Sequence, residues 1–238
     1  MNAGMNLTEL RKELRAHSNP EQVQNLQRFF KTGKGQYGEN DKFLGIKVPE
    51  QRIIAKKYQQ IDLKSVEKLL GSGWHEERLT AIHILNLKYS IADGPEQKYI
   101  FDLYFKNVKY INNWDLVDSS APYFIGNYLF NKNRGILYKL VKSKNLWERR
   151  VAIMTTFYFI RQGQFEDTLK LAKILLEDEH DLIQKAVGWM LREVGNRSIS
   201  TEELFLKQNY RKMPRTMLRY AIEKFPDKKR KGYLYGNK

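Results

Sequence analysis

Apolar residues recur at spacings of three and four along almost the whole chain, and long runs that alternate apolar and polar residues are absent. This spacing puts apolar side chains on one face of an α-helix, whereas a half-buried strand alternates with a period of two. The sequence therefore predicts an all-α protein. With 238 residues, of which 42% are hydrophobic, the chain is long enough to bury a real core.

Start and stop signals divide this pattern into helices. Asn19 offers a cap before Pro20, and residues 200–203 have the form of a capping box. Pro122 lies inside one expected helix, which we expect to be kinked or split there, with Ser120 as a candidate cap for the second part. The predicted helices span 7–16, 20–31, 49–59, 63–70, 76–89, 95–106, 115–130, 135–142, 146–161, 166–176, 182–194, 201–208 and 214–224.

Three similar segments open the second helix of a predicted pair. Arg150 lies 72 positions after Arg78 and 35 before Lys185, and one step of about 36 from Arg78 reaches Trp114. This period is typical of an α-solenoid of HEAT-like helix pairs, which has one concave face, and we expect a single domain over residues 1–238. In this register, equivalent helices place four residues together along the concave face: Trp114, Asp118, Arg150 and Trp189. We expect disorder in the basic tail, residues 226–238.

The charge balance indicates an anionic partner. Lys and Arg number 42 against 27 Asp and Glu, so the formal net charge is +15. A folded chain with 13% aromatic residues and this charge favours nucleic acid as the partner, with an anionic membrane surface as the second choice. The absence of cysteine excludes disulfides, thiolate zinc sites and a thiol nucleophile. No stretch approaches the roughly 18 apolar residues of a membrane span, and no signal peptide is visible, so we expect a cytoplasmic protein.

Two motifs do not support a cofactor site. His75-Glu76-Glu77-Arg78-Leu79 lacks the second histidine, four residues after the first, that a zinc protease needs. The Gly-rich segment 33–42 lacks the Gly-Lys-Ser/Thr ending of a P-loop. We interpret that segment as a flexible connector, with a phosphate cradle as the alternative. We expect neither a metal nor an organic cofactor.

Trp114 and Asp118 are the most informative pair. They are four residues apart and therefore share one face of a helix. A carboxylate beside an indole, in a chain with a large positive charge, indicates a place where a cation is stabilised. The structural alternative is an ordinary helix start, in which Asp118 interacts with the helix dipole. We interpret Asp115 as the helix N-cap.

Two further regions carry candidate residues. Arg192 follows Trp189 by three residues and shares its face, although a tryptophan in such a helix is most often buried by packing. Cations and tyrosines alternate near the C-terminus and predict a phosphate-binding surface, with a solvated tail as the alternative. These residues are Lys207, Arg211, Lys212, Arg215, Arg219, Lys224, Lys228, Lys229, Arg230 and Lys231, interleaved with Tyr210, Tyr220, Tyr233 and Tyr235.

Four segments, in this order, are typical of one family. They are Phe43-Leu44-Gly45-Ile46 with Pro49-Glu50, Trp114-Asp115-Leu116-Val117-Asp118-Ser119, Asn145-Leu146-Trp147-Glu148-Arg149-Arg150-Val151-Ala152 and Ile183-Gln184-Lys185-Ala186-Val187-Gly188-Trp189-Met190-Leu191-Arg192-Glu193. From about Pro20 to Lys224 the chain resembles the AlkD-like family of bacterial DNA alkylation-repair proteins.

The resemblance implies a HEAT-like solenoid that holds duplex DNA in a basic, concave groove. It implies an N-glycosylase that excises N3- and N7-alkylated purines without a pocket for a flipped base. Asp118 matches the catalytic carboxylate, Trp114 and Trp189 match the tryptophans that flank the sugar, and Arg150 matches an arginine that contacts the DNA backbone. We expect a monomer that acts on double-stranded DNA at the nucleoid, with no membrane partner.

Other positions complete the expected DNA contacts or depart from the family pattern. Phe29 stands where we expect a groove tyrosine, and Lys47 stands at a position that can approach DNA. Arg192, Arg215 and Arg219 are the remaining predicted contacts. The same fold allows two alternatives to a glycosylase: the protein binds DNA without excising bases, or it is a protein-interaction scaffold.

Overall fold

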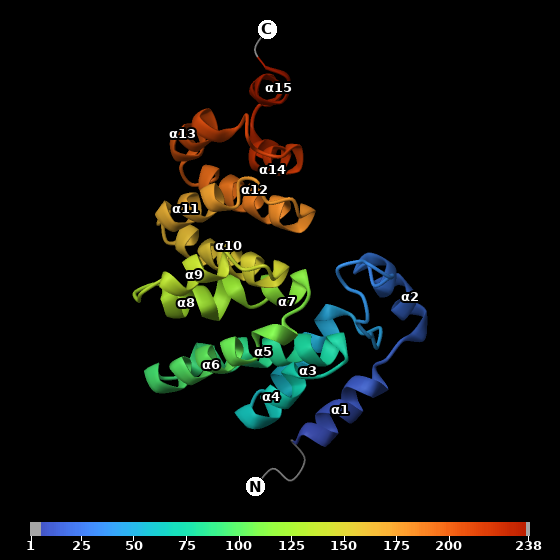
Figure 1. Ribbon diagram of the computed structural model, residues 1–238. Coiled ribbons are helices and arrows are strands. Elements are labelled where there is room, and N and C mark those ends of the chain that lie inside the picture. The colour runs from blue at the N-terminus through green and yellow to red at the C-terminus, as the bar shows by residue number, and fades with distance from the viewer. Residues whose placement is uncertain (1–5, 237–238) are drawn as a thin grey trace. The chain divides into compact units, whose positions relative to one another are not determined.

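A computed structural model describes residues 6–236 of the chain (Figure 1). These residues form helices joined by turns and loops, and the isolated bridge between Lys42 and Trp74 belongs to no strand. The all-α prediction is confirmed. Within the described range, no helix is both long enough and apolar enough to cross a bilayer. Contacts within the chain divide it into two compact units, of which unit 1 ends at Ser120 and unit 2 begins at Ala121.

Unit 1 is built around one buried helix. The helix α5 packs against α3, α4 and α6 and contributes fully buried side chains such as Ile82, Ile84 and Leu85 to the core (Figure 1). The elements of unit 1 are α1 (Leu7–Ala16), α2 (Pro20–Phe29), α3 (Val48–Lys57), α4 (Leu63–Leu70), α5 (His75–Ile91), α6 (Gly94–Lys106), the 3₁₀ turn η1 (Val108–Tyr110) and α7 (Trp114–Asp118).

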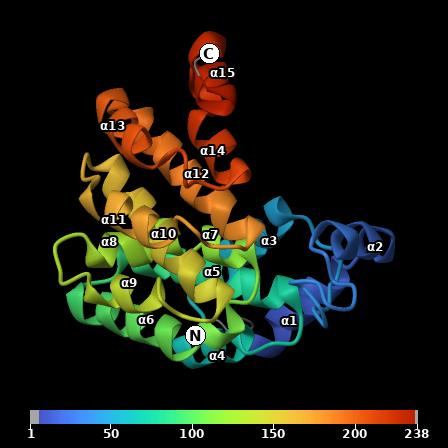
Figure 2. The same ribbon diagram turned by 45° about the horizontal axis from the view of Figure 1, so that its top comes forward.

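In unit 2, successive long helices pack against one another. The helix α10 contacts α12, and α12 contacts both α13 and α14 (Figure 2). A Cβ at Gly188 would collide with the carbonyl oxygen of Met217, so this glycine allows α12 and α14 to approach closely. The elements of unit 2 are η2 (Ala121–Ile125), α8 (Gly126–Leu129), α9 (Gly135–Leu140), α10 (Leu146–Arg161), α11 (Glu166–Ile174), α12 (Asp181–Gly195), α13 (Ile199–Asn209), α14 (Arg215–Ala221), η3 (Ile222–Lys224) and α15 (Asp227–Tyr235).

The helix predicted for residues 115–130 is split, as Pro122 led us to expect. α7 ends at Asp118, and Pro122 lies in the π-helical turn η2 that precedes α8. A π turn accommodates a residue that cannot donate the normal helical hydrogen bond. The prediction that Ser120 caps the second part is wrong, because its hydroxyl donates backwards to the carbonyl oxygen of Leu116, 2.8 Å away.

The starts of α5, α10 and α12 share a local hydrogen-bond pattern. In each helix, the residue two before the N-cap accepts the N-cap backbone N–H through its side-chain oxygen. Its backbone carbonyl then accepts from the side chain of the fourth helical residue. The three sets are Ser72, Trp74 and Arg78; Ser143, Asn145 and Arg149; and Asp178, His180 and Gln184.

This shared pattern corrects the predicted repeat register by one residue. Arg78 is equivalent to Arg149 and Gln184, whereas the sequence comparison aligned it with Arg150 and Lys185. One residue rotates a side chain by about 100° around a helix, so the error changes which face each residue occupies. The repeat itself, in which consecutive helices pack on their neighbours, is consistent with the predicted α-solenoid.

The basic tail contains a helix, contrary to the disorder that we expected after residue 226. α15 spans Asp227–Tyr235 and is tied to earlier helices of unit 2. Lys229 pairs with Glu203 on α13, and the guanidinium of Arg215 on α14 donates to the carbonyl oxygen of Leu234, 2.6 Å away. These tertiary contacts stabilise a segment that is too short and too charged to be a stable helix in isolation.

Candidate functional site

The short helix α7 carries Trp114 and Asp118. Its N-cap is Asn113, whose side-chain oxygen accepts the backbone N–H of Trp114 at 2.8 Å. The interpretation of Asp115 as the N-cap is therefore wrong. Trp114 and Asp118 are both half-buried, and both line the same pocket in unit 1. The four-residue spacing has placed the indole and the carboxylate on one face, as predicted.

That pocket has a volume of about 570 Å³, and aromatic rings line part of it, beside aliphatic and charged side chains. The ring of Phe30 lies 5.2 Å from the ring of Trp114 and stacks on Phe43. Phe29 is 61% exposed, and its ring meets Trp114 edge to face at 5.6 Å. The exposed Lys47, at the N-cap of α3, also lines the pocket. Four of the predicted site residues thus gather here: Trp114, Asp118, Phe29 and Lys47.

A buried network of charges lies against this pocket. The Nδ1 atom of His75 lies 2.9 Å from an oxygen of Asp41, and its Nε2 atom lies 2.7 Å from an oxygen of Asp115. Arg78 contacts the other oxygen of Asp41 at 2.7 Å. Burial alone would lower the pKa of His75, but Asp115 and Asp41 outweigh it and raise that pKa to about 9. His75 is therefore an imidazolium at neutral pH.

The network balances its charges and anchors α7. Burial opposes ionisation of Asp41, but hydrogen bonding from His75 and the charge of Arg78 outweigh it and lower the pKa of Asp41. Two cations and two carboxylates share the buried volume, so none is left uncompensated. Because Asp115 neighbours Trp114 on α7, the network joins α7 to the start of α5 and to the loop that contains Asp41.

A third buried carboxylate shapes a loop that lines the pocket. Glu76 accepts the backbone N–H groups of Leu44, Gly45 and Ile46 at 2.8–3.2 Å. Gly45 has a φ of 86°, and a Cβ there would collide with the carbonyl oxygen of Asn19. This loop contributes Phe43 and Ile46 to the pocket. Sequence patterns did not indicate the contacts of His75 with Asp41 or of Glu76 with the loop, because these partners lie 30 or more positions away.

In unit 2, Trp189 lies half-buried on α12. Its indole nitrogen donates to Glu193 at 3.2 Å, and its ring lies 6.1 Å from that of Phe157. Arg192, three residues on, pairs with Glu223. Both side chains are therefore engaged within the unit, and Trp189 keeps part of its indole surface accessible.

The predicted DNA-binding arginines differ in how accessible they are. Arg150 is 5% exposed, and its Nη1 donates to the carbonyl oxygen of Leu182 at 2.6 Å. Its neighbour Arg149 forms a half-buried ion pair with Asp178. On α14, Arg215 is exposed while bonded to α15, and Arg219 is exposed with no ion pair to the described part of the chain.

No group of histidine and carboxylate side chains in the described range has an arrangement that could hold a metal ion. The His75 network satisfies its own charges through direct contacts. What unit 1 offers instead is a carboxylate at an aromatic surface, which is suited to stabilising positive charge.

Comparison with known proteins shows the family to which the chain belongs. A search of the curated proteins finds no match. One similar solved structure is described as a predicted DNA alkylation repair enzyme from Enterococcus faecalis. It has a TM-score of 0.70 and 18% identity, and the match covers 89% of this chain and 98% of that one, which shows a shared fold. Residues 10–225 match the family described as DNA alkylation repair enzyme, and the protein belongs to this family.

Proposed function

We propose that this protein is a DNA glycosylase that excises N3- and N7-alkylated purines from duplex DNA. One observation carries the proposal: Trp114 and Asp118 line the same aromatic pocket, on a helix anchored by a buried charge network. Family membership supports DNA alkylation repair as the process. The glycosylase reaction is the chemistry that this carboxylate and indole fit best.

In this reaction the substrate supplies a good leaving group, and the protein stabilises the charge on the sugar. Alkylation at N3 or N7 gives the purine a positive charge, so the base leaves when the glycosidic bond breaks and its electron pair moves onto the base. The deoxyribose then carries oxocarbenium character at C1′. Asp118 and the face of Trp114 stabilise that positive charge. A water molecule adds to C1′ and loses a proton, and Asp118 orients this water or accepts its proton.

The proposal keeps the base outside the unit 1 pocket. A cationic purine becomes neutral as it leaves, so it does not require a protein acid, and the protein acts on the sugar instead. The exposed ring of Phe29 and the ammonium of Lys47 would contact the DNA near Asp118. Phe29 lacks the hydroxyl that we expected a groove tyrosine to supply, so its contacts with DNA are apolar, whereas those of Lys47 are ionic.

Unit 2 supplies the remaining proposed contacts. The half-buried Trp189 would flank the sugar, and Arg150 would contact the backbone in place of its bond to Leu182. Arg215 and Arg219, which are exposed, would bind phosphates, and Arg192 would do so in place of its pair with Glu223. We further propose that the protein acts as a monomer and as one functional domain over residues 1–238.

The test is release of free methylated base from alkylated duplex DNA by the wild type and by Asp118→Asn. The substitution keeps the size of the side chain but removes its charge. Loss of one such electrostatic group costs roughly 3 kcal/mol of barrier, so we expect release to fall about a hundredfold or more. Binding of undamaged duplex and the unfolding midpoint should stay close to wild type.

Asp102→Asn is the matched control, because Asp102 is an exposed carboxylate of unit 1 that is paired with Lys98 outside the pocket. Normal release by Asp118→Asn would disprove the role of the carboxylate. If neither wild type nor variant releases base while duplex binding is tight, the protein is a DNA-binding paralogue without glycosylase activity. If duplex is not bound at low salt, both DNA functions are wrong.

A further inference from the structure

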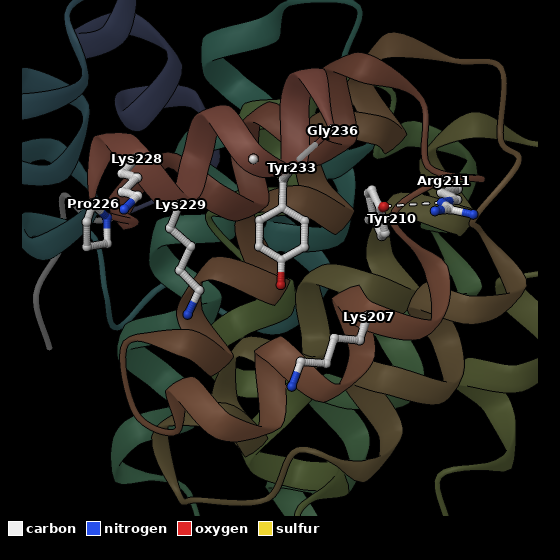
Figure 3. Close-up of a pocket in the computed structure, with 9 residues that line it drawn as sticks. Lys207, Tyr210, Arg211, Pro226, Lys228, Lys229, Tyr233 and Gly236 are labelled. Atoms are coloured by element: carbon white, nitrogen blue, oxygen red, sulfur yellow. Dashed lines mark hydrogen bonds between the residues drawn. The ribbon is translucent and has the colours of Figure 1, made fainter. Parts of the chain in front are cut away.

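A second cavity, in unit 2, lies between α13 and the C-terminal helix α15. It has a volume of about 810 Å³, in the range of small-ligand sites. Figure 3 shows the side chains of Lys207, Lys229 and Tyr233 converging on it, with Tyr210 and Arg211 along one side. The cavity is separate from the pocket that contains Trp114 and Asp118, and it uses residues of unit 2 alone.

Positive charge in this cavity is largely uncompensated. Four cationic side chains line it and, within the described range, no carboxylate does. Lys229 is paired with Glu203, but Lys207, Arg211 and Lys228 are exposed and form no ion pair with the described residues. Such a cluster raises the local concentration of anions, and binding one of them relieves the repulsion among the cations.

Aromatic side chains give the cavity a second property. The rings of Tyr210 and Tyr233 meet edge to face at 5.4 Å, and Arg211 donates to the hydroxyl of Tyr210 at 3.1 Å. Phenol hydroxyls donate to phosphate oxygens, and aromatic faces accept sugars or bases. Together with the ammonium and guanidinium groups, they are better suited to bind a nucleic-acid backbone than to bind a ligand with an isolated carboxylate.

Part of this cavity is formed by residues that follow the segment matching the family. That match ends at residue 225, whereas Pro226, Lys228, Lys229, Gly232, Tyr233 and Gly236 supply one wall. α15 is held in place by the ion pair of Lys229, by Arg215 and by the packing of Tyr233 on Tyr210. The wall that α15 contributes is therefore fixed by tertiary contacts within unit 2.

We propose that this basic cavity binds the phosphodiester backbone of DNA, as a contact additional to the reaction site. The inference rests on the proposed function in taking DNA as the partner. An anionic membrane fits less well, because α15 has only Tyr233, Leu234 and Tyr235 as apolar residues, all in its last turn, and so has no continuous apolar face to insert. Lys207, Arg211 and Lys228 are the principal phosphate ligands.

The experiment compares duplex binding by wild type and by the combined variant Lys207→Gln, Arg211→Gln and Lys228→Gln across a salt series. The probe is a short, undamaged, fluorescent duplex. Each phosphate contact adds roughly 0.9 to the steepness with which log affinity falls with log salt. We expect the variant to lose roughly 2–3 from this slope and to bind at least about tenfold more weakly at low salt.

The control variant removes the same charge from unit 1 through Lys56→Gln, Lys64→Gln and Lys68→Gln, all exposed. If the control variant loses as much duplex affinity as the cavity variant, the effect comes from net charge alone, and the proposed site is wrong. An unchanged slope in the cavity variant would also overturn the site. If the cavity variant instead loses affinity only for inorganic phosphate, or only for vesicles that contain anionic lipid, then DNA is not the ligand.

The result is separable from the test of the glycosylase. Normal base release with an unchanged salt slope would remove this site and leave the reaction. A reduced slope in the cavity variant, with no base release by the wild type, would support the DNA-binding cavity and disprove the glycosylase reaction.

Discussion

Each unit buries a titratable residue whose pKa is raised, and the two residues reach that state in opposite ways. His75 in unit 1 is held as a cation between Asp41 and Asp115. Glu202 in unit 2 is 1% exposed, and burial, followed by the nearby Glu203, raises its pKa to about 8. At neutral pH His75 is charged and Glu202 is neutral.

The difference shows what burial does with and without counter-charges. A buried group gives up its own charge where burial outweighs the nearby opposite charges, as it outweighs Arg192 and Lys229 at Glu202. A buried group with two carboxylates keeps its charge and connects the elements that carry them. Only the arrangement in unit 1 can hold a neighbouring helix in position, and that helix carries Trp114 and Asp118.

The largest expected effect comes from removing the cation of unit 1. His75→Ala would leave the buried Asp41 and Asp115 without their shared partner, and loss of one member of such a network typically costs about 3–5 kcal/mol. Urea unfolding at neutral pH measures this change. A cost below about 1 kcal/mol would mean that the network does not stabilise unit 1, and the contrast with Glu202 would disappear.

The pH dependence of unfolding sharpens the same contrast. The pKa of His75 rises from its ordinary 6.5 to about 9 on folding, so its contribution is fully present below 6.5 and is lost as pH rises through about 9. We expect the free energy of unfolding to fall by on the order of 3 kcal/mol over this window. Urea titrations at several pH values test this, and in His75→Ala the decline between pH 8 and 9 should be absent, because Glu202 contributes to the decline only below about pH 8.

A smaller change of opposite sign is expected from Glu202→Gln. The pKa of Glu202 is raised from 4.5 to about 8, so the wild type loses stability as pH rises through that window. A neutral amide of the same shape does not ionise, and we expect the variant to be about 2 kcal/mol more stable than wild type above pH 8. Glu177→Gln, at an exposed glutamate of unit 2, is the control. Equal stability of wild type and Glu202→Gln at pH 9 would contradict a neutral, buried Glu202.

The smallest expected effect concerns the rim of the unit 1 pocket. Phe29→Ala removes an exposed ring that contacts Trp114 edge to face, an interaction worth about 1 kcal/mol. We expect base release to slow by roughly fivefold, with stability nearly unchanged. Ile53→Ala, at an equally exposed apolar residue outside the pocket, should leave the rate unaltered. Identical rates for both variants would limit the site to Trp114 and Asp118.

Much of the helical pattern could be predicted from local signals. The predicted bounds 7–16, 63–70 and 146–161 agree with α1, α4 and α10 at both ends. Caps, apolar spacing and prolines act within one or two helical turns, so a linear sequence displays them. The Trp114–Asp118 pair follows from the same helical geometry, and family membership agrees with the resemblance of the segments around it.

The failures arose where partners are distant along the chain. His75 lies 34 positions from Asp41 and 40 from Asp115, and no local pattern relates the three. The repeat was aligned one residue out because Arg149 and Arg150 are chemically alike, and only their different partners in the folded protein distinguish them: Ser143 and Asp178 for Arg149, and Leu182 for Arg150. The tail was expected to be disordered because its stabilising partners are on α13 and α14.

The sequence by itself determined the helices of this protein, its positive charge and the shared face of Trp114 and Asp118, because each depends on composition or on neighbours within a few residues. Tertiary structure alone decided which buried groups are charged, what anchors α7 and where α15 lies. The physical reason is that burial and counter-charges set ionisation and docking, and both depend on residues brought together only by folding.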